Sequence, residues 1–263
     1  MNKPTDSEIR DILGESDESL LKAWSPGDPL AILAWGPAGV GKTHLGMTFP
    51  KPIFAFDFDL NMNETMRQFQ GQNIFKRTFM VPPLGEWLRA KELADRFLKE
   101  YYEALTKLER LGKSTGVYGS VMLDSVTQLW DLLRYAYVPM DADGRTKSAW
   151  NYGGVNNKYQ ALFMEAKNRG VNLFAAARSK NVWTENEKGN RVKTTLQEID
   201  CKDETLFLSS VVTEVAVEDR YVKGKLERQR VYKIRKCSAN GNLTGLESGK
   251  LDYPTLIELI ESM

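Results

Sequence analysis

The feature that most constrains this chain is the run of residues 36–43, Gly-Pro-Ala-Gly-Val-Gly-Lys-Thr. It follows an apolar stretch, residues 30–35, and precedes a segment compatible with a helix, residues 43–49. A strand, a glycine-rich turn and a helix in this order make a loop whose backbone N–H groups surround a phosphate, and the helix start adds a partial positive charge. The alternative is an ordinary glycine-rich turn. The pattern predicts that the chain binds a nucleoside triphosphate.

Within this loop, residue types predict individual roles. Lys42 is expected to reach the β- and γ-phosphates, and the Thr43 hydroxyl is expected to bind Mg²⁺, which prefers oxygen ligands. The expected cofactors are therefore ATP and Mg²⁺, and the expected activity is that of an ATPase. The loop residues expected to contact the nucleotide are Gly36, Pro37, Ala38, Gly39, Val40, Gly41, Lys42 and Thr43.

Composition removes several other kinds of chemistry. Among the 263 residues there are two cysteines, Cys201 and Cys237, and one histidine, His44. The cysteines lack C-x-x-C spacing and the chain has a single histidine, so zinc sites and histidine-based triads are not expected, and any catalysis is expected to use carboxylates, Lys, Arg and magnesium. No apolar run approaches the length of about 18 residues that a membrane span needs, and the N-terminus is polar. We therefore expect a cytoplasmic protein with no membrane partner.

The order of apolar and polar segments predicts an α/β fold. We expect a mostly parallel sheet with an antiparallel hairpin near the C-terminus. The expected strands are residues 30–35, 53–58, 117–123 and 171–177, the hairpin strands are 211–217 and 229–234, and the expected helices are 84–110, 126–137 and 156–168. Residues 139–154 and the polar stretch 178–200 are expected to lie outside these elements. The expected organisation is a helical extension at 1–27, an ATPase core at 28–240, and a tail at 241–263 with a helix at 254–261.

Acidic side chains follow two of the expected strands. Asp124 ends the strand Ser-Val-Met-Leu-Asp, and an aspartate at the carboxyl edge of a parallel sheet is placed to hold the magnesium ion. Ser125 comes next, where many ATPases place a water-activating glutamate, so the base is expected elsewhere. The candidate is Asp59, with Asp57 behind it, because we expect the second strand to end next to the first. A solvated aspartate is the alternative.

These segments resemble the RecA-like recombinase and motor ATPases. The resemblance rests on the phosphate loop, on Ala-Phe-Asp-Phe-Asp at 55–59 and on Leu-Asp-Ser-Val at 123–126. It implies that Asp59 fills the position of the catalytic acid, where the family usually has glutamate. It also implies that Arg178, after the strand 172–177, senses the γ-phosphate and couples it to DNA, unless that side chain only caps the strand and faces solvent.

The same resemblance implies two DNA-binding loops, at about 139–157 and 179–197. Aromatic side chains interleaved with cations suit single strands, because bases stack on the rings and phosphates pair with the cations. Trp150 and Trp183 have packing in the core as the alternative. The residues expected to contact nucleic acid are Arg145, Lys147, Trp150, Lys180, Trp183, Lys188, Arg191 and Lys193.

A cluster of basic residues lies in the C-terminal hairpin. Lys233-Ile-Arg235 resembles the Lys-x-Arg element that hexameric helicases and related rings insert into a neighbour's nucleotide site. Strand alternation puts Lys233 and Arg235 on one face. The resemblance implies a homo-oligomer, either a ring or a filament, with active sites shared between subunits. The alternative is a solvated basic hairpin that lies along DNA.

Within this family, the chain resembles the phage Sak-type single-strand annealing proteins. That similarity rests on residues 151–159, Asn-Tyr-Gly-Gly-Val-Asn-Asn-Lys-Tyr, and 170–174, Gly-Val-Asn-Leu-Phe, within a region of likeness at 28–240. It implies an ATP-dependent recombination protein that binds single-stranded DNA and promotes annealing or strand pairing in a phage-infected bacterial host. The alternatives are a helicase or loader motor with the same fold and a small-molecule phosphotransferase.

Overall fold

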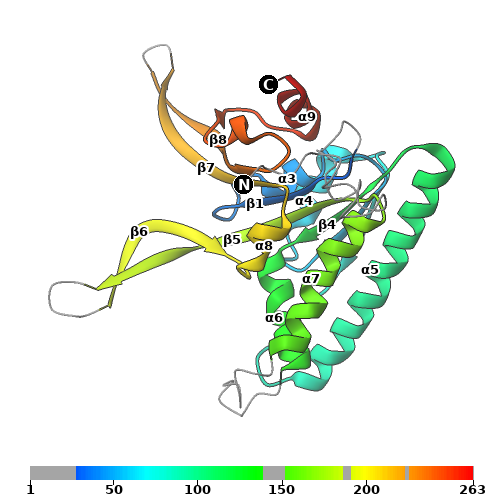
Figure 1. The fold of residues 1–263 in the computed structure, drawn as a ribbon. Helices are drawn as coiled ribbons and strands as arrows, with labels where there is room; N and C mark the ends of the chain where they lie inside the picture. Colours follow the sequence, from blue (N-terminus) through cyan, green and yellow to red (C-terminus); the bar gives the residue numbers. More distant parts are fainter. Residues whose placement is uncertain (1–27, 139–151, 186–190, 223–224, 263) are drawn as a thin grey trace, which may run out of the picture.

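The structure is a computed structural model that describes residues 28–138, 152–185, 191–222 and 225–262. Its centre is a sheet with the strand order β3-β2-β4-β5-β1-β7-β8-β9, and β6 pairs with β5 (Figure 1). The strands are β1 (Ala31–Trp35), β2 (Ile53–Asp57), β3 (Ile74–Thr78), β4 (Ser120–Asp124), β5 (Asn172–Glu185), β6 (Arg191–Asp200), β7 (Val211–Val222), β8 (Lys225–Cys237) and β9 (Glu247–Ser248).

Strands β3, β2, β4, β5, β1 and β7 pair in parallel, whereas β6, β8 and β9 pair antiparallel. The fold class predicted from sequence, a mostly parallel α/β sheet with a C-terminal antiparallel hairpin, is therefore confirmed. Helices cover both faces of this part of the sheet, so side chains on both sides of a parallel strand are buried. Strands such as β1 and β4 are therefore nearly continuous apolar runs.

Each face of the sheet carries its own hydrophobic cluster. On β1, Leu33 packs into one cluster, while Ile32 and Ala34 pack into the other, as strand alternation requires. The first cluster is covered by α5 (Trp87–Thr115), α6 (Val126–Tyr137), α7 (Tyr152–Asn168) and α8 (Glu204–Leu208). The second is covered by α3 (Lys42–Gly46), α4 (Met62–Met66) with the 3-10 turn η2 (Arg67–Phe69), η4 (Gly241–Leu243) and α9 (Tyr253–Ser262). In Figure 1 the long helices α5, α6 and α7 lie together, away from α9.

The long helix α5 shows how the sequence selects an element. Its buried residues, among them Ala94, Phe97, Tyr101 and Leu108, recur at helical spacing and form one apolar stripe. The helix ends at Gly116, which has a φ of 73° and closes the last turn with an N–H bond to the Gly112 carbonyl. The predicted helices at 84–110 and 126–137 are confirmed, the first with its bounds shifted toward the C-terminus.

Two sequence predictions about the sheet are wrong. Residues 178–185 and 191–200 pair as antiparallel strands where a polar loop was expected, because β5 runs on to Glu185 and pairs with β6. The second strand does not end next to the first, because β4 and β5 lie between β2 and β1. The chain passes from β1 to β2 over the positions that β4 and β5 later fill, so spatial order in this sheet does not follow order along the chain.

The structure describes the C-terminal tail up to residue 262 but not the N-terminal residues 1–27. The expected helical extension at 1–27 lies outside the described residues, as does most of the expected loop at 139–154; its last residues, from Tyr152, belong to α7. The tail packs against the core, since Leu243, Leu251, Leu256 and Ile260 are buried in the second hydrophobic cluster. The helix that was predicted at 254–261 is confirmed as α9.

Candidate functional site

The glycine-rich loop joins β1 to α3 and is shaped by three glycines with positive φ. Gly36, Gly39 and Gly41 have φ values of 148°, 77° and 100°. Conformations of this kind are disfavoured for residues with a Cβ, so they explain the glycine spacing. At Gly36 space is also limiting, because a Cβ there would lie 2.1 Å from the Val215 carbonyl oxygen on β7. The loop is thus held tightly against the sheet on one side.

Lys42 closes this loop from inside. Its Nζ donates hydrogen bonds to the carbonyl oxygens of Gly36 and Pro37, each over 2.7 Å. Burial lowers the pKa of Lys42, and the nearby carboxylates of Asp124 and Asp59 oppose that shift. Among the residues that the structure describes, these two neutral carbonyls are the hydrogen-bond acceptors of the ammonium group, which is well suited to exchange them for phosphate oxygens.

Asp124 and Thr43 meet at the carboxyl edge of the sheet. The Thr43 Oγ1 donates to Asp124 Oδ2 over 2.7 Å, and Asp124 is buried. Burial raises the pKa of Asp124 to about 6, with Thr43 and Lys42 acting against the shift and Asp59 adding to it. A hydroxyl and a buried carboxylate are the ligands that Mg²⁺ prefers, and a divalent cation would offset the cost of burying this charge. The residues present therefore fit the expected metal, with Thr43 and Asp124 as its protein ligands.

The expected catalytic acid is bonded to the expected sensor. Arg178 Nη2 lies 2.7 Å from Asp59 Oδ1, and Arg178 Nε lies 3.2 Å from Asp59 Oδ2. The Ser125 hydroxyl donates to the same Oδ1 over 3.0 Å. Asp59 follows β2, Ser125 follows β4, and Arg178 follows the part of β5 that pairs in parallel. These three strands are neighbours in the sheet, so their carboxyl ends meet at one edge. Asp59, which follows β2, therefore lies at the site because β2 is the neighbour of β4. The sequence had suggested instead that β2 is the neighbour of β1.

Asp57 is enclosed by the protein. It is fully buried, neither of its oxygens accepts a hydrogen bond from a described residue, and its nearest cation is Lys76 Nζ at 3.6 Å. The Asp59 side chain, by contrast, is 15% exposed. Of the two candidate bases, Asp59 is the one that solvent water can reach.

One wall of the expected nucleotide site was not among the residues predicted from the sequence. A pocket of about 840 Å³ opens at the phosphate loop and is lined on its far side by residues of α4 and η2, such as Asn63 and Arg67. Arg230 of β8 lines it as well. Burial, followed by the Arg230 charge, lowers the pKa of His44 in the same pocket. Side chains alternate between the two faces of a strand, so Arg230 and Tyr232 lie on the face of β8 opposite to Lys233 and Arg235. This alternation could have been predicted from the sequence.

The Lys-x-Arg pair is held inside its own subunit. Arg235 Nε lies 2.8 Å from Glu214 Oε2, and the Lys233 Nζ lies 2.7 Å from Glu218 and 3.2 Å from Glu247. Both cations therefore project from one face of β8, as alternation predicted, and both have carboxylate partners on β7 or β9.

The residues expected to bind DNA fall into two groups. Trp183 is 54% exposed on the β5–β6 hairpin, so the alternative of a core tryptophan is wrong. Lys193 lies opposite it in the ladder, Arg191 is two residues away on β6, and Lys180 makes ion pairs with Glu198 and Asp200. The predicted contacts that lie outside the described residues are Arg145, Lys147, Trp150 and Lys188.

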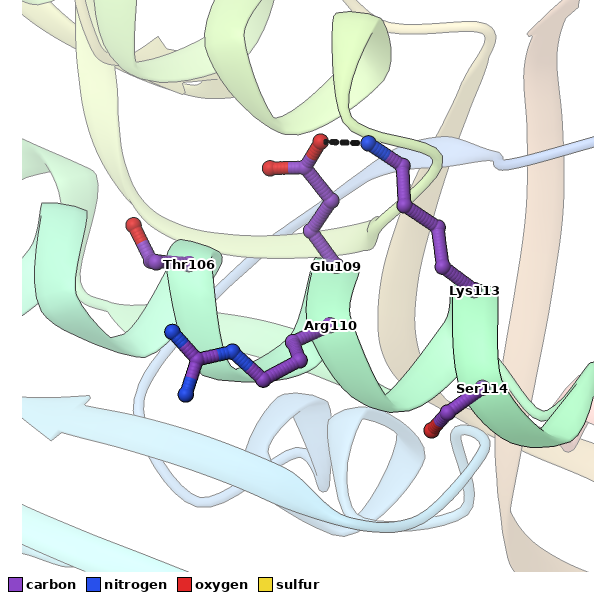
Figure 2. Close-up of a pocket in the computed structure, with 5 residues that line it drawn as sticks. All are labelled: Thr106, Glu109, Arg110, Lys113 and Ser114. Atoms are coloured by element: carbon purple, nitrogen blue, oxygen red, sulfur yellow. Dashed lines mark hydrogen bonds and ion pairs between the residues drawn. The ribbon is translucent and has the colours of Figure 1, made fainter.

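A second hollow, of about 480 Å³, lies on helix α5 (Figure 2). Figure 2 shows Glu109 and Lys113 joined by an ion pair, which spans 2.6 Å. Thr106 and Glu109 also contact Arg169, at 3.0 and 3.6 Å. Thr106, Glu109 and Lys113 therefore already have polar partners, and no residue of the phosphate loop lines this hollow.

The fold and this loop define a P-loop nucleotide-binding protein. A family model described as an AAA domain matches residues 28–240, so the chain belongs to that family. Among solved structures it is similar to a KaiC-like protein from the hyperthermophilic archaeon Pyrococcus horikoshii OT3, with 14% identity, 82% of this chain and 88% of that chain covered, and a TM-score of 0.43. No curated protein matches the chain. In the described ranges no helix is long and apolar enough to cross a membrane.

Proposed function

We propose that this chain is an ATPase that binds single-stranded DNA and promotes annealing or strand pairing. Its family and fold are those of a P-loop ATPase, and the DNA role rests on one observation. The strand that carries Arg178, the partner of Asp59, continues outward as the exposed hairpin that carries Trp183.

In the nucleotide site, the phosphate loop binds the triphosphate, and Thr43 and Asp124 hold Mg²⁺, which would neutralise charge that develops on the phosphates. Asp59 accepts the proton of the attacking water. In the conformation described, the guanidinium of Arg178 contacts both oxygens of that carboxylate. Because the guanidinium contacts both oxygens of this carboxylate, the Arg178 contact must loosen before the attacking water can hydrogen-bond to Asp59 in its place.

The hairpin β5–β6 supplies a mechanical link. The Thr127 hydroxyl accepts from the Arg178 N–H over 3.1 Å and donates to the Asp200 carbonyl, so it ties both strands to α6 at the base of the hairpin. Bases that stack on Trp183, with phosphates near Lys193 and Arg191, would shift this hairpin and with it Arg178. DNA binding would then release Asp59.

We further propose that subunits assemble as a ring or filament in which Lys233 and Arg235 reach a neighbour's nucleotide. Their carboxylate partners on β7 and β9 are between 19% and 42% exposed, and ion pairs that solvent reaches contribute only about 0–1 kcal/mol each. Exchanging these carboxylates for a neighbour's phosphate therefore costs Lys233 and Arg235 little free energy.

The test is the ATPase rate with and without single-stranded DNA, measured for the parent and for Arg178→Ala. We expect DNA to accelerate the parent and to leave Arg178→Ala at one rate in both conditions. Lys42→Ala is the control for contaminating ATPase and should be inactive. A parent rate that DNA does not change would contradict the proposed coupling, and processive unwinding of duplex would favour a helicase motor.

A further inference from the structure

Arg230 lies over the phosphate loop of its own subunit. A Cβ built on Gly41 would lie 2.5 Å from Arg230 Cζ, 2.7 Å from Nε and 2.8 Å from Nη2. The guanidinium therefore occupies the space directly above the residue that caps α3, next to the backbone that would surround a β-phosphate. Glycine is needed at position 41 for this approach as well as for its backbone conformation.

This arginine differs from the two basic residues that follow it on β8. Lys233 and Arg235 bind carboxylates, whereas Arg230 has no carboxylate within ion-pair distance among the residues that the structure describes. Its side chain is exposed, yet it lines the pocket with the phosphate loop. A cation in this position is available to an anionic ligand that enters the pocket.

The charges that line the pocket favour a polyphosphate. Lys42, Arg67 and Arg230 are cations, and Glu64 is the carboxylate among the lining residues. Arg230 lies against Gly41, whereas the Thr43 hydroxyl is turned to Asp124, where the metal and the γ-phosphate are expected.

We propose that Arg230 binds the α- or β-phosphate of the nucleotide in its own subunit, and so sets affinity for nucleoside diphosphates and triphosphates alike. This assignment rests on the proposed nucleotide site. It gives the β8 strand two roles on its two faces: Arg230 acts within the subunit, and the Lys233–Arg235 pair points away from that site.

The test compares Arg230→Gln with Arg228→Gln, a matched control. Arg228 is an exposed arginine two residues along the same strand that does not line the pocket. Dissociation constants for ADP and for a non-hydrolysable ATP analogue, with Mg²⁺, are measured by calorimetry. Because the lost contact is a charge-assisted one, Arg230→Gln should weaken both ligands by the same factor, about 10- to 100-fold. Arg228→Gln should bind both as the parent does.

Three outcomes would overturn the assignment. If Arg230→Gln binds ADP with the parent's affinity, Arg230 does not touch the α- or β-phosphate, even though the nucleotide site stands. If only the ATP analogue is weakened, Arg230 faces the γ-phosphate. If the parent binds neither ligand while its thermal melting shows a folded protein, both this assignment and the proposed ATPase fail together. Melting curves of the two variants check that each is folded.

Discussion

Two hairpins, β5–β6 and β7–β8, project from the sheet (Figure 1). Both are rich in basic side chains, but these side chains differ in whether they are paired with acids. In β7–β8, Lys233 and Arg235 bind acids of their own subunit, and the base of the hairpin is part of the main sheet. In β5–β6, Lys180 also pairs with acids, Glu198 and Asp200, but Arg191 and Lys193, near the exposed Trp183, make no ion pair with a described residue. A cluster of charge along a sequence therefore does not say which charges are available to a partner.

The hairpins also connect to the nucleotide site at different points. β5–β6 begins at Arg178, which holds the candidate base Asp59. β7–β8 passes over the phosphate loop through Arg230, and the Val215 carbonyl of β7 limits the space at Gly36. We therefore expect β5–β6 to affect turnover through the base and β7–β8 to affect the binding of phosphates.

The largest effect is expected at Arg235. If it reaches a neighbour's γ-phosphate, Arg235→Ala should slow turnover about 10³- to 10⁵-fold. Mixing it with Lys42→Ala should restore part of the ATPase rate, because mixed interfaces combine an intact loop with an intact Arg235. Arg228→Ala is the control on the same strand. Full turnover by Arg235→Ala, or an inactive mixture in which the two proteins co-assemble, would reduce the pair to a basic hairpin surface.

The second-largest effect is expected at Asp59, the candidate base that Arg178 of the β5–β6 hairpin contacts. Asp59→Asn should slow turnover about 10²- to 10⁴-fold and leave ATP affinity unchanged, because the lost group handles a proton and does not hold the phosphates. Single-turnover rates and equilibrium binding separate the two quantities. The matched variant is Asp57→Asn. A greater loss of rate in Asp57→Asn than in Asp59→Asn would move the base to the buried carboxylate.

A smaller effect distinguishes the hairpins as DNA surfaces. Trp183→Ala should lose about 1–3 kcal/mol of binding free energy for single-stranded DNA, since one stacking platform is removed. Tyr221→Ala, at the exposed end of β7–β8, should lose little. Fluorescence anisotropy measures both affinities at two salt concentrations, and circular dichroism verifies folding. Equal losses in the two variants would mean that the hairpins do not differ in this respect.

The smallest effect tests whether the ion pair on β7–β8 is easily exchanged. A double-mutant cycle with Glu214→Gln and Arg235→Ala should give a coupling of about 0.2–1 kcal/mol in the free energy of unfolding. Urea denaturation of the four proteins measures it. A coupling above about 2 kcal/mol would show instead that the pair stabilises the subunit, which would make exchange with a neighbour's phosphate costly.

Much of the nucleotide site could be predicted from the sequence, because its determinants are local. The phosphate loop needs glycines at fixed spacing for its backbone conformation, and Asp124 directly ends an apolar strand. The contact between Thr43 and Asp124 follows from these two patterns, since parallel strands bring their carboxyl ends to one edge. The pairing of Asp59 with Arg178 did not follow, because it depends on which strands are neighbours.

By itself, then, the sequence determined the elements and their chemistry: the α/β alternation, the glycine-rich loop, the acid at 124 and the basic C-terminal hairpin. Only the tertiary structure decided the strand order that separates β2 from β1, the extension of β5 into a hairpin, the partners of Lys233 and Arg235, and the approach of Arg230 to Gly41. The physical reason is that loop geometry and strand burial depend on nearby residues. Strand order and ion pairing depend on residues distant in sequence, and these meet only when the sheet has formed.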